Sequence, residues 1–263
     1  MISDRRVRFV LGTSLMIVLG GAWAVSGEGS ESDCSRWLRL GQDEASRAEN
    51  VRQTHDVDAL IDHLEKARDA FAKAMKACPD SAKAPWIQVQ SRLAYCRYKG
   101  GHFGDACDTY AELLKLEPSR AMDRAIYADA LEQSGEYTEA VEQFQSLIQA
   151  GAQHQAAFYC NMALIYALEV GDGAQAVETA KRGIDGAGNL PCLQFAWGKG
   201  LVVSGVRMLE TPDTNRGLEL LDEAKLKFAA LKDDPDYGGK ARAELNNIER
   251  IQGERSRKAK EKR

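Results

Sequence analysis

The side chains with the clearest chemical potential in this chain are six cysteines and four histidines. His55, His63, His102 and His154 are scattered, and none has a second ligand at the spacing of a metal site such as H-E-x-x-H or C-x-x-C. The chain also lacks the G-x-S-x-G, P-loop and dinucleotide-binding patterns of common enzyme classes. We therefore expect no catalytic residue, no metal and no cofactor.

The cysteines point to disulfide chemistry instead. Their number is even, and an even number of cysteines in an oxidising compartment favours disulfides. The alternative is a set of buried thiols that pack as small hydrophobic residues. Spacing alone does not choose among the possible pairings of Cys34, Cys78, Cys96, Cys107, Cys160 and Cys192.

An apolar run near the N-terminus predicts the compartment. Three arginines precede Phe9–Val25, whose 17 residues lie between a signal-peptide core and a full membrane span. Ala22-Trp23-Ala24 offers a small-x-small cleavage site. We expect residues 1–24 to be a signal peptide, or an N-terminal anchor retained in the inner membrane, and residues 25–32 to be a flexible leader. Either alternative places the rest of the chain outside the cytosol, in the periplasm or secreted.

The charge distribution argues against nucleic acid as a partner. The net charge is −4, and the last eleven residues, Gly253–Arg263, carry six Lys and Arg against two Glu. The body between the N-terminal segment and this tail therefore has a charge of −10. Phosphate contacts need a basic face, which this body does not provide. We interpret the basic tail as a solvated helix end.

The body of the chain contains an internal repeat. Gly101, Gly135 and Gly171 stand 34 and 36 residues apart. They lie within RLAYCRYKGGHFGDACDTYAELLKLEP (92–118), AIYADALEQSGEYTEAVEQFQSLIQAG (125–151) and NMALIYALEVGDGAQAVETAKRGID (161–185). A helical period on both sides of a glycine, repeated about every 34 residues, indicates stacked helical hairpins. Each hairpin leaves an apolar face that only its neighbours can cover, so we expect an elongated all-α solenoid.

These segments resemble tetratricopeptide repeats. Small residues occupy the positions where the two helices of a unit meet, aromatic residues fill the wider gaps, and glycine forms the turn. In the first two units these are Ala94, Gly101, Phe103, Ala106 and Tyr110, then Ala128, Gly135, Tyr137, Ala140 and Phe144. The resemblance implies a right-handed superhelical solenoid of antiparallel hairpins, with about five units over residues 33–236. A capping helix at 237–252 and the basic tail at 253–263 would follow.

Three further units match less closely. The first carries about 14 inserted residues, including Asn50–Asp58, which predicts long helical arms or an extended loop. The third regular unit has one extra residue, and its Gly173 and Ala180 replace the usual aromatic residues, which predicts looser packing. A polar cavity there would suit an enzyme or ligand carrier. The last unit is expected at Cys192–Met208 and Arg216–Leu231.

The repeat register also bears on the cysteines. It places Cys34 at the start of the first helix of one hairpin and Cys78 at the end of the second helix, so the resemblance implies a Cys34–Cys78 disulfide. Cys96 and Cys107 are expected to be small buried residues. Cys160 and Cys192 lie near the starts of successive first helices, a longer-range pairing that stays open.

The family binds partners in a concave groove lined by the first helix of each hairpin. Carried over to this chain, the partner-binding residues are Arg92, Tyr95, Tyr98, Lys99, Asp129, Gln133 and Asn161, with an apolar floor at Met122, Ile126, Leu164 and Leu168. Tyrosine and arginine often dominate binding energy, and an extended or helical peptide could lie along such a floor. The resemblance thus implies a non-enzymatic scaffold or adaptor for a protein or peptide, and no small-molecule ligand. The alternative is a membrane-anchored subunit of an envelope complex, associated with the membrane through residues 9–25.

Overall fold

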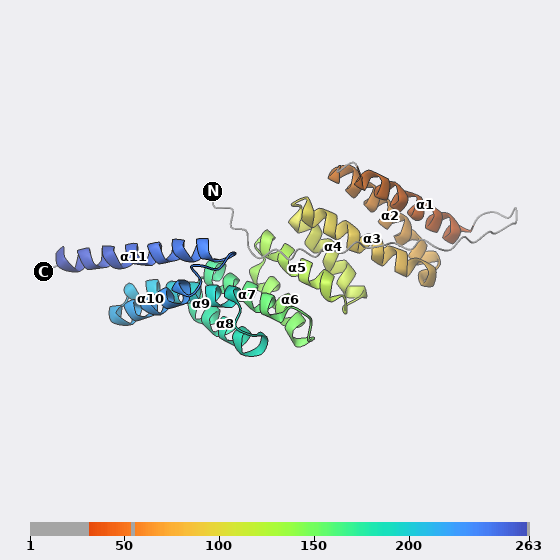
Figure 1. The fold of residues 1–263 in the computed structure, drawn as a ribbon. Helices are drawn as coiled ribbons and strands as arrows, with labels where there is room; N and C mark the ends of the chain where they lie inside the picture. The colour runs from red at the N-terminus through yellow and green to blue at the C-terminus, as the bar shows by residue number, and fades with distance from the viewer. Residues whose placement is uncertain (1–31, 54–55, 262–263) are drawn as a thin grey trace.

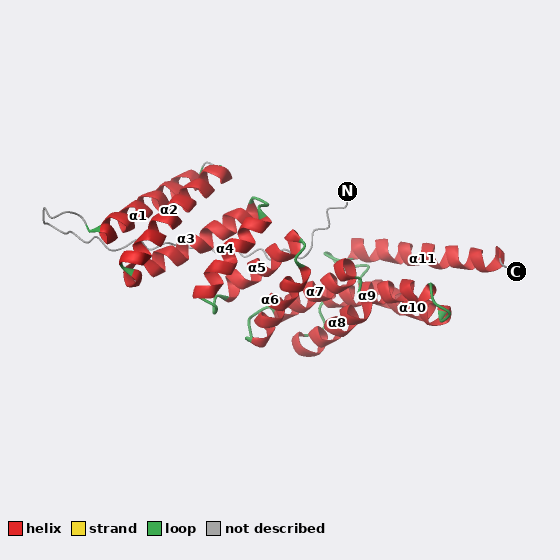
Figure 2. Cartoon of the chain, turned by 180° about the vertical axis from the view of Figure 1, so that it is seen from behind, coloured by secondary structure: helices red, strands yellow, loops and turns green. Residues whose placement is uncertain are grey.

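The computed structural model describes residues 32–53 and 56–261, and these residues form helices joined by short connections. Figure 1 shows the helices as a row of hairpins, with α1 and α2 at one end and α10 and α11 at the other. Seen from behind in Figure 2, the described part contains helices and loops without strands. The expectations for residues 1–31 lie outside the described residues. Among the described helices, none combines the length and apolarity of a membrane span.

Five antiparallel hairpins and a final helix make up the solenoid, which confirms the predicted all-α repeat architecture. The helices are α1 (Asp33–Arg52), α2 (Val57–Ala77), α3 (Pro79–Lys99), α4 (Phe103–Leu116), α5 (Ala121–Ser134), α6 (Tyr137–Gln149), α7 (Gln155–Ile165), α8 (Gly173–Ala187), α9 (Pro191–Leu209), α10 (Thr214–Ala229) and α11 (Gly238–Glu261). A π-helical segment, η1 (Tyr166–Val170), continues α7.

The repeat glycines end the first helix of three hairpins. Gly101, Gly135 and Gly171 have φ angles of 82°, 89° and 72°, in the left-handed region where a side chain is disfavoured. The Gly135 and Glu136 amides donate to carbonyls of the last turn of α5, which closes the helix end. The glycine spacing therefore follows from the need for the same turn in each unit.

The inserted residues of the first unit lengthen its helices. α1 and α2 have 20 and 21 residues, against 14 and 13 in α5 and α6. Side-chain caps at Ser32 and Asp56 define where the two long helices begin. The sequence left two alternatives open, long helical arms or an extended loop. The described residues, which leave out 54–55, show long arms.

The extra residue of the fourth hairpin is absorbed by η1. The backbone amide of Gly171 donates to the carbonyl of Tyr166, five residues earlier, so this turn of the helix holds one residue more than an α-turn. The helix therefore ends in the same left-handed glycine turn as its neighbours, although its sequence is longer. The widened turn leaves Leu168 and Val170 exposed.

The expected looser packing around Gly173 and Ala180 is wrong. A Cβ atom at Gly173 would lie 2.4 Å from the carbonyl oxygen of Gly200 and 2.5 Å from Ser204 Oγ, so α8 and α9 touch backbone to backbone here. Ala180 is completely buried. The small residues bring the helices closer together instead of leaving a gap, which removes the basis for a ligand cavity at this position.

The apolar core is divided into three successive clusters along the array. One lies between α1 and α5, a second between α3 and α7, and a third between α7 and α11. Tyr110, Phe144 and Phe228 are the largest fully buried side chains, one in each cluster. Each hairpin thus buries its apolar faces against its neighbours, as expected for a solenoid.

A single helix, α11, covers the C-terminal end of the array and packs on α10. It covers all but the first residue of the range predicted as a cap, 237–252, and most of the range predicted as a basic tail, 253–263. Ala241 and Ile248 are fully buried on its inner side, whereas Ala243 is exposed. Its apolar stripe therefore begins at Ala241, and Tyr237 just before the helix belongs to the same buried cluster.

Candidate functional site

The odd-numbered helices form the inner row of the solenoid. Besides the contacts between consecutive helices, α3 packs on α5 and α7 packs on α9, whereas no even-numbered helix of the described part contacts another even-numbered helix to a comparable extent. Helices on the inner side of a curved stack lie closer together than those on the outer side. We call the exposed surface of α3, α5 and α7 the inner face.

Part of the expected partner-binding set is engaged in contacts within the chain. Arg92 on α3 forms an ion pair with Glu49 on α1 at 2.8 Å, and its side chain is only 17% exposed. The Tyr98 hydroxyl donates a hydrogen bond to Asp129 on α5. These side chains connect neighbouring hairpins, and a partner would have to disrupt these contacts to use them.

A second hydrogen-bonded group ties α3 to α5. Ser91 Oγ donates to Asp123 Oδ1 at 2.6 Å, and Arg120 forms an ion pair with the same carboxylate. Asp123 is only 5% exposed. A buried carboxylate with two partners fixes the angle between the two helices, because losing either partner would leave a charge poorly satisfied. The inner face is therefore held in a defined shape without a bound ligand.

The residues left accessible on the inner face are partly aromatic and apolar. Tyr95 on α3, Met122 on α5 and Leu168 in η1 are 44%, 50% and 37% exposed. Lys99 and Gln133 are also exposed, and Asn161 is half-buried. Leu164, expected in the floor, is instead buried in the core at 6% exposure. Three successive inner helices, counting η1 with α7, thus each present at least one large apolar side chain to solvent.

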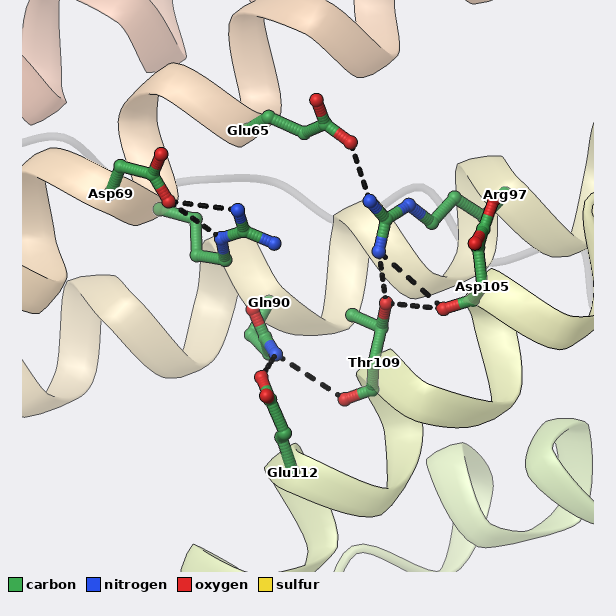
Figure 3. A network of polar contacts seen from close by, with 8 residues as sticks. Glu65, Asp69, Gln90, Arg97, Asp105, Thr109 and Glu112 are labelled. Carbon is green, nitrogen blue, oxygen red and sulfur yellow. Dashed lines mark hydrogen bonds and ion pairs between the residues drawn. The ribbon is translucent and has the colours of Figure 1, made fainter.

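On another part of the molecule, a polar network joins α2, α3 and α4 (Figure 3). Arg97 forms an ion pair with Glu65, and its guanidinium also donates to Thr109 Oγ1 and to the carbonyl of Asp105. Gln90 Nε2 donates to Glu112 at 2.8 Å and to the carbonyl of Thr109 at 3.4 Å. The sequence analysis did not find this network, because its partners come from three helices and share no local motif.

The network borders a shallow cleft of about 230 Å³. Asp58, Asp62, Glu65 and Asp105 line it together with Arg97 and His102. Asp62 is held by Lys66 at 2.6 Å and Glu65 by Arg97, so half of the carboxylates already have a cation. In the described ranges, no group of three or more His, Cys, Asp and Glu side chains could hold a metal ion. We interpret the network as a connection between the first two hairpins.

The cysteines fall into three environments. Cys34 and Cys78 are joined in a disulfide with an S–S distance of 1.97 Å, between the start of α1 and the end of α2. Cys96 and Cys107 are buried thiols; burial raises the pKa of Cys96, and raises the pKa of Cys107 to about 11. They are inert packing residues, as expected. Cys160 on α7 and Cys192 on α9 are thiols that contact each other.

Comparison with known proteins agrees with this architecture. Residues 88–119 match the family model described as tetratricopeptide repeat. A search of curated proteins finds no match.

Two solved structures share the fold. The nearly identical TPR-like repeats of a putative kinesin light chain from Podosopora anserina are 20% identical, cover 75% of this chain and 99% of their own, and superpose with a TM-score of 0.50. A tetratricopeptide repeat protein from Parabacteroides merdae is 14% identical, covers 80% of this chain and 79% of its own, and gives a TM-score of 0.51. One hairpin of the chain, within α3 and α4, thus matches a tetratricopeptide repeat, and the solved structures share its solenoid fold.

Proposed function

We propose that this protein is a non-enzymatic adaptor that binds a partner protein or peptide on its inner face. Proteins of this fold generally mediate protein–protein interactions. The observation that carries the proposal is the exposure of Tyr95, Met122 and Leu168 on three successive inner helices. Exposed large side chains that recur on successive inner helices favour a docking surface, whereas isolated ones would need no explanation.

The contacts around this face support binding without rearrangement. Tyr98–Asp129 and Ser91–Asp123 link α3 to α5, and a surface that is already ordered pays little conformational entropy when a partner docks. An extended or helical segment with apolar side chains would suit the spacing of one apolar residue per hairpin. Lys99 and Gln133 at the edge of the face can hydrogen-bond to such a segment.

We also propose that the protein acts outside the cytosol. Two features support this: the basic and apolar N-terminal segment up to Val25, and the disulfide between Cys34 and Cys78. Disulfides persist in oxidising compartments and are rare in the cytosol. This part of the proposal is tested by expressing the protein, fractionating the cells and sequencing the N-terminus of the recovered chain.

The inner face is tested with the triple variant Tyr95→Ala/Met122→Ala/Leu168→Ala. Arg92 and Tyr98 are left unchanged, because replacing them would also loosen contacts between hairpins. The matched control is Leu226→Ala on the outer helix α10, which removes an even more exposed leucine. Both variants should melt within a few degrees of the parent.

The readout is capture of partners by crosslinking from the native fraction, followed by titration of the identified partner. We expect the parent and Leu226→Ala to bind alike. The triple variant should bind at least about tenfold more weakly, since an aromatic anchor alone contributes about 1 kcal/mol or more. Equal binding by all three proteins would show that the inner face is not the docking surface.

A further inference from the structure

Two of the four free thiols form a pair that the adaptor function does not use. Cys160 on α7 and Cys192 on α9 lie beside each other where these two helices of the inner row pack together. Both belong to the C-terminal apolar cluster, Cys160 inside it and Cys192 at its edge. The other two free thiols, Cys96 and Cys107, lie in separate clusters.

The two members of the pair differ in exposure and in their local surroundings. Cys192 is half-buried and is the second residue of α9, where the unpaired backbone amides of a helix start favour negative charge. The neighbouring Cys160 thiol, and then the backbone amides of Leu193 and Cys192 itself, lower the pKa of Cys192. Cys160 is only 1% exposed. The neighbouring Cys192 and burial raise its pKa, so it keeps its proton.

The segment before α11 completes the surroundings of the pair. Tyr237 is 7% exposed. Its hydroxyl is buried and makes no hydrogen bond of normal geometry. The hydroxyl lies next to the Cys160 thiol. The Lys240 ammonium group also acts on Cys160 and favours its ionised form. Burial raises the pKa of Tyr237, so this hydroxyl keeps its proton. The pair therefore faces a phenol that can donate a hydrogen bond and a cation that can stabilise negative charge on sulfur.

We propose that Cys160 and Cys192 form a thiol–disulfide exchange site whose substrate is a low-molecular-weight disulfide, with Cys192 as the attacking residue and Cys160 as the resolving residue. The site is independent of whatever the inner face binds. The more accessible sulfur, that of Cys192, meets the substrate, and the buried sulfur of Cys160 lies beside the atom that it must attack.

The reaction proceeds in two exchanges. The Cys192 thiolate attacks one sulfur of the substrate R–S–S–R, a bond forms between Cys192 Sγ and that sulfur, and the other sulfur leaves as a thiolate. The Cys160 thiol gives its proton to the departed thiolate, and its sulfur then attacks Cys192 Sγ and expels the second thiolate, which takes a proton from water. Two protein thiols are thereby oxidised to one disulfide while one substrate disulfide is reduced to two thiols.

The product is a covalent link between α7 and α9, the first helices of two successive hairpins. It would hold these hairpins at a fixed distance and would be reversed by an excess of small thiol. Cys34–Cys78 joins two helices of one hairpin, so the two disulfides would constrain different parts of the array.

The test uses the full chain with Cys34–Cys78 intact and oxidised glutathione as the probe. Products are quantified by intact mass and by mapping of non-reduced peptides. The parent should pass through a glutathione adduct at Cys192 and end with a Cys160–Cys192 crosslink. Cys160→Ser should stop at a stable adduct on Cys192, and Cys192→Ser should show neither product.

The matched control is Cys107→Ser, which removes a buried thiol outside the pair and should react like the parent. Modification at Cys192 should be at least about tenfold faster than at Cys107, because the larger thiolate fraction outweighs the loss of intrinsic nucleophilicity. If Cys160→Ser does not fold, the proposal is tested by the order in which the Cys192 adduct and the Cys160–Cys192 crosslink appear in the parent protein.

Three results would overturn the proposal. The first is a parent that keeps its adduct without forming the crosslink. The second is an adduct on Cys160 in the Cys192→Ser variant, which would reverse the assigned order. The third is modification of Cys192 no faster than that of Cys107, which would show an ordinary partly exposed thiol.

Discussion

The two ends of the solenoid are stabilised by different means, although each terminal hairpin has a neighbouring hairpin on one side only. At the N-terminal end, Cys34–Cys78 closes α1 and α2, and Trp37 on α1 is contacted by the cations of Arg36 and Lys73 at 5.2 and 4.3 Å from its ring. At the C-terminal end, α11 covers the last hairpin and buries Ile248 completely. Within residues 32–53 and 56–261, one end is thus closed covalently and the other is covered by a helix.

The interiors of the two ends also differ. The N-terminal hairpin contains a nearly buried carboxylate, Glu44, which pairs with Arg47 and lies 2.7 Å from His63 Nδ1. The C-terminal cluster contains packed aromatic rings instead, with Phe195 5.5 Å from Phe228 and 5.4 Å from Tyr237. Both ends bury apolar side chains, among them Leu64 and Phe71 at the N-terminal end. The polar pairs of Glu44 add little net stability there, and the disulfide supplies a further constraint.

Removal of the disulfide should have the largest effect. The double variant Cys34→Ser/Cys78→Ser opens a loop with a sequence separation of 44 residues, which costs about 4 kcal/mol in the chain-entropy account. Hydrogen exchange should show α1 and α2 losing protection while α9 and α10 keep theirs. An equal loss of protection at both ends would mean that the array unfolds as one unit. The two ends would then not differ in their local stability.

Ile248→Ala should weaken the other end. It removes a fully buried side chain between α11 and the last hairpin, and such truncations typically cost about 2–4 kcal/mol. The melting transition should fall, and protection should be lost first in α10 and α11. Leu226→Ala on α10 is the control, since its side chain is 72% exposed and its loss should change stability by about 0.5 kcal/mol or less. A similar loss from both variants would argue against α11 as a structural cap.

Gly173→Ala should cost somewhat less, about 1–3 kcal/mol, because a Cβ atom there would meet the backbone of α9. Gly253→Ala is the matched control, because that glycine lies in α11 with open space around it. Its replacement should stabilise the protein by up to about 1 kcal/mol through helix propensity. Denaturant unfolding of both variants measures the difference. A neutral Gly173→Ala would show that α8 and α9 can separate at little cost.

The smallest structural disturbance comes from alkylation of thiols at different pH values. Cys107 should become reactive only as the pH approaches its pKa of about 11, because burial disfavours its thiolate. The pKa of Cys192 is lowered, so its rate should level off below pH 9.0, the ordinary value for a cysteine. Iodoacetamide labelling with peptide mapping gives both profiles. Coincident profiles would remove the chemical distinction between Cys192 and the buried thiols.

Much of the fold could be predicted from the sequence, because its determinants are local and periodic. Gly101, Gly135 and Gly171 mark turns that need a left-handed residue, and the small residues between them mark where helices meet. The packing around Gly173 could not be predicted in the same way. A missing aromatic residue can leave a gap or can let the neighbouring helix approach, and only the position of Gly200 in space decides which occurs.

The inner face was harder to predict than the fold. The repeat register predicts which helices line the groove, but Arg92 is held by Glu49 and Tyr98 by Asp129, partners that lie more than 30 residues away in the sequence. Whether a surface residue is available depends on such distant pairings. Leu168, expected in the floor of the groove, lies in η1 and is 37% exposed. The extra residue in the sequence indicated the local change of helical period at η1 only indirectly.

The position of the Cys34–Cys78 bond also determines how the chain transmits tension. The bond joins the second residue of α1 directly to the residue before Pro79, the first residue of α3. A pulling force applied ahead of Asp33 would therefore pass through the sulfur atoms into α3, and α1 and α2 would carry almost none of it. The first hairpin therefore lies outside the part of the chain that carries the force, and such a force would not unfold it.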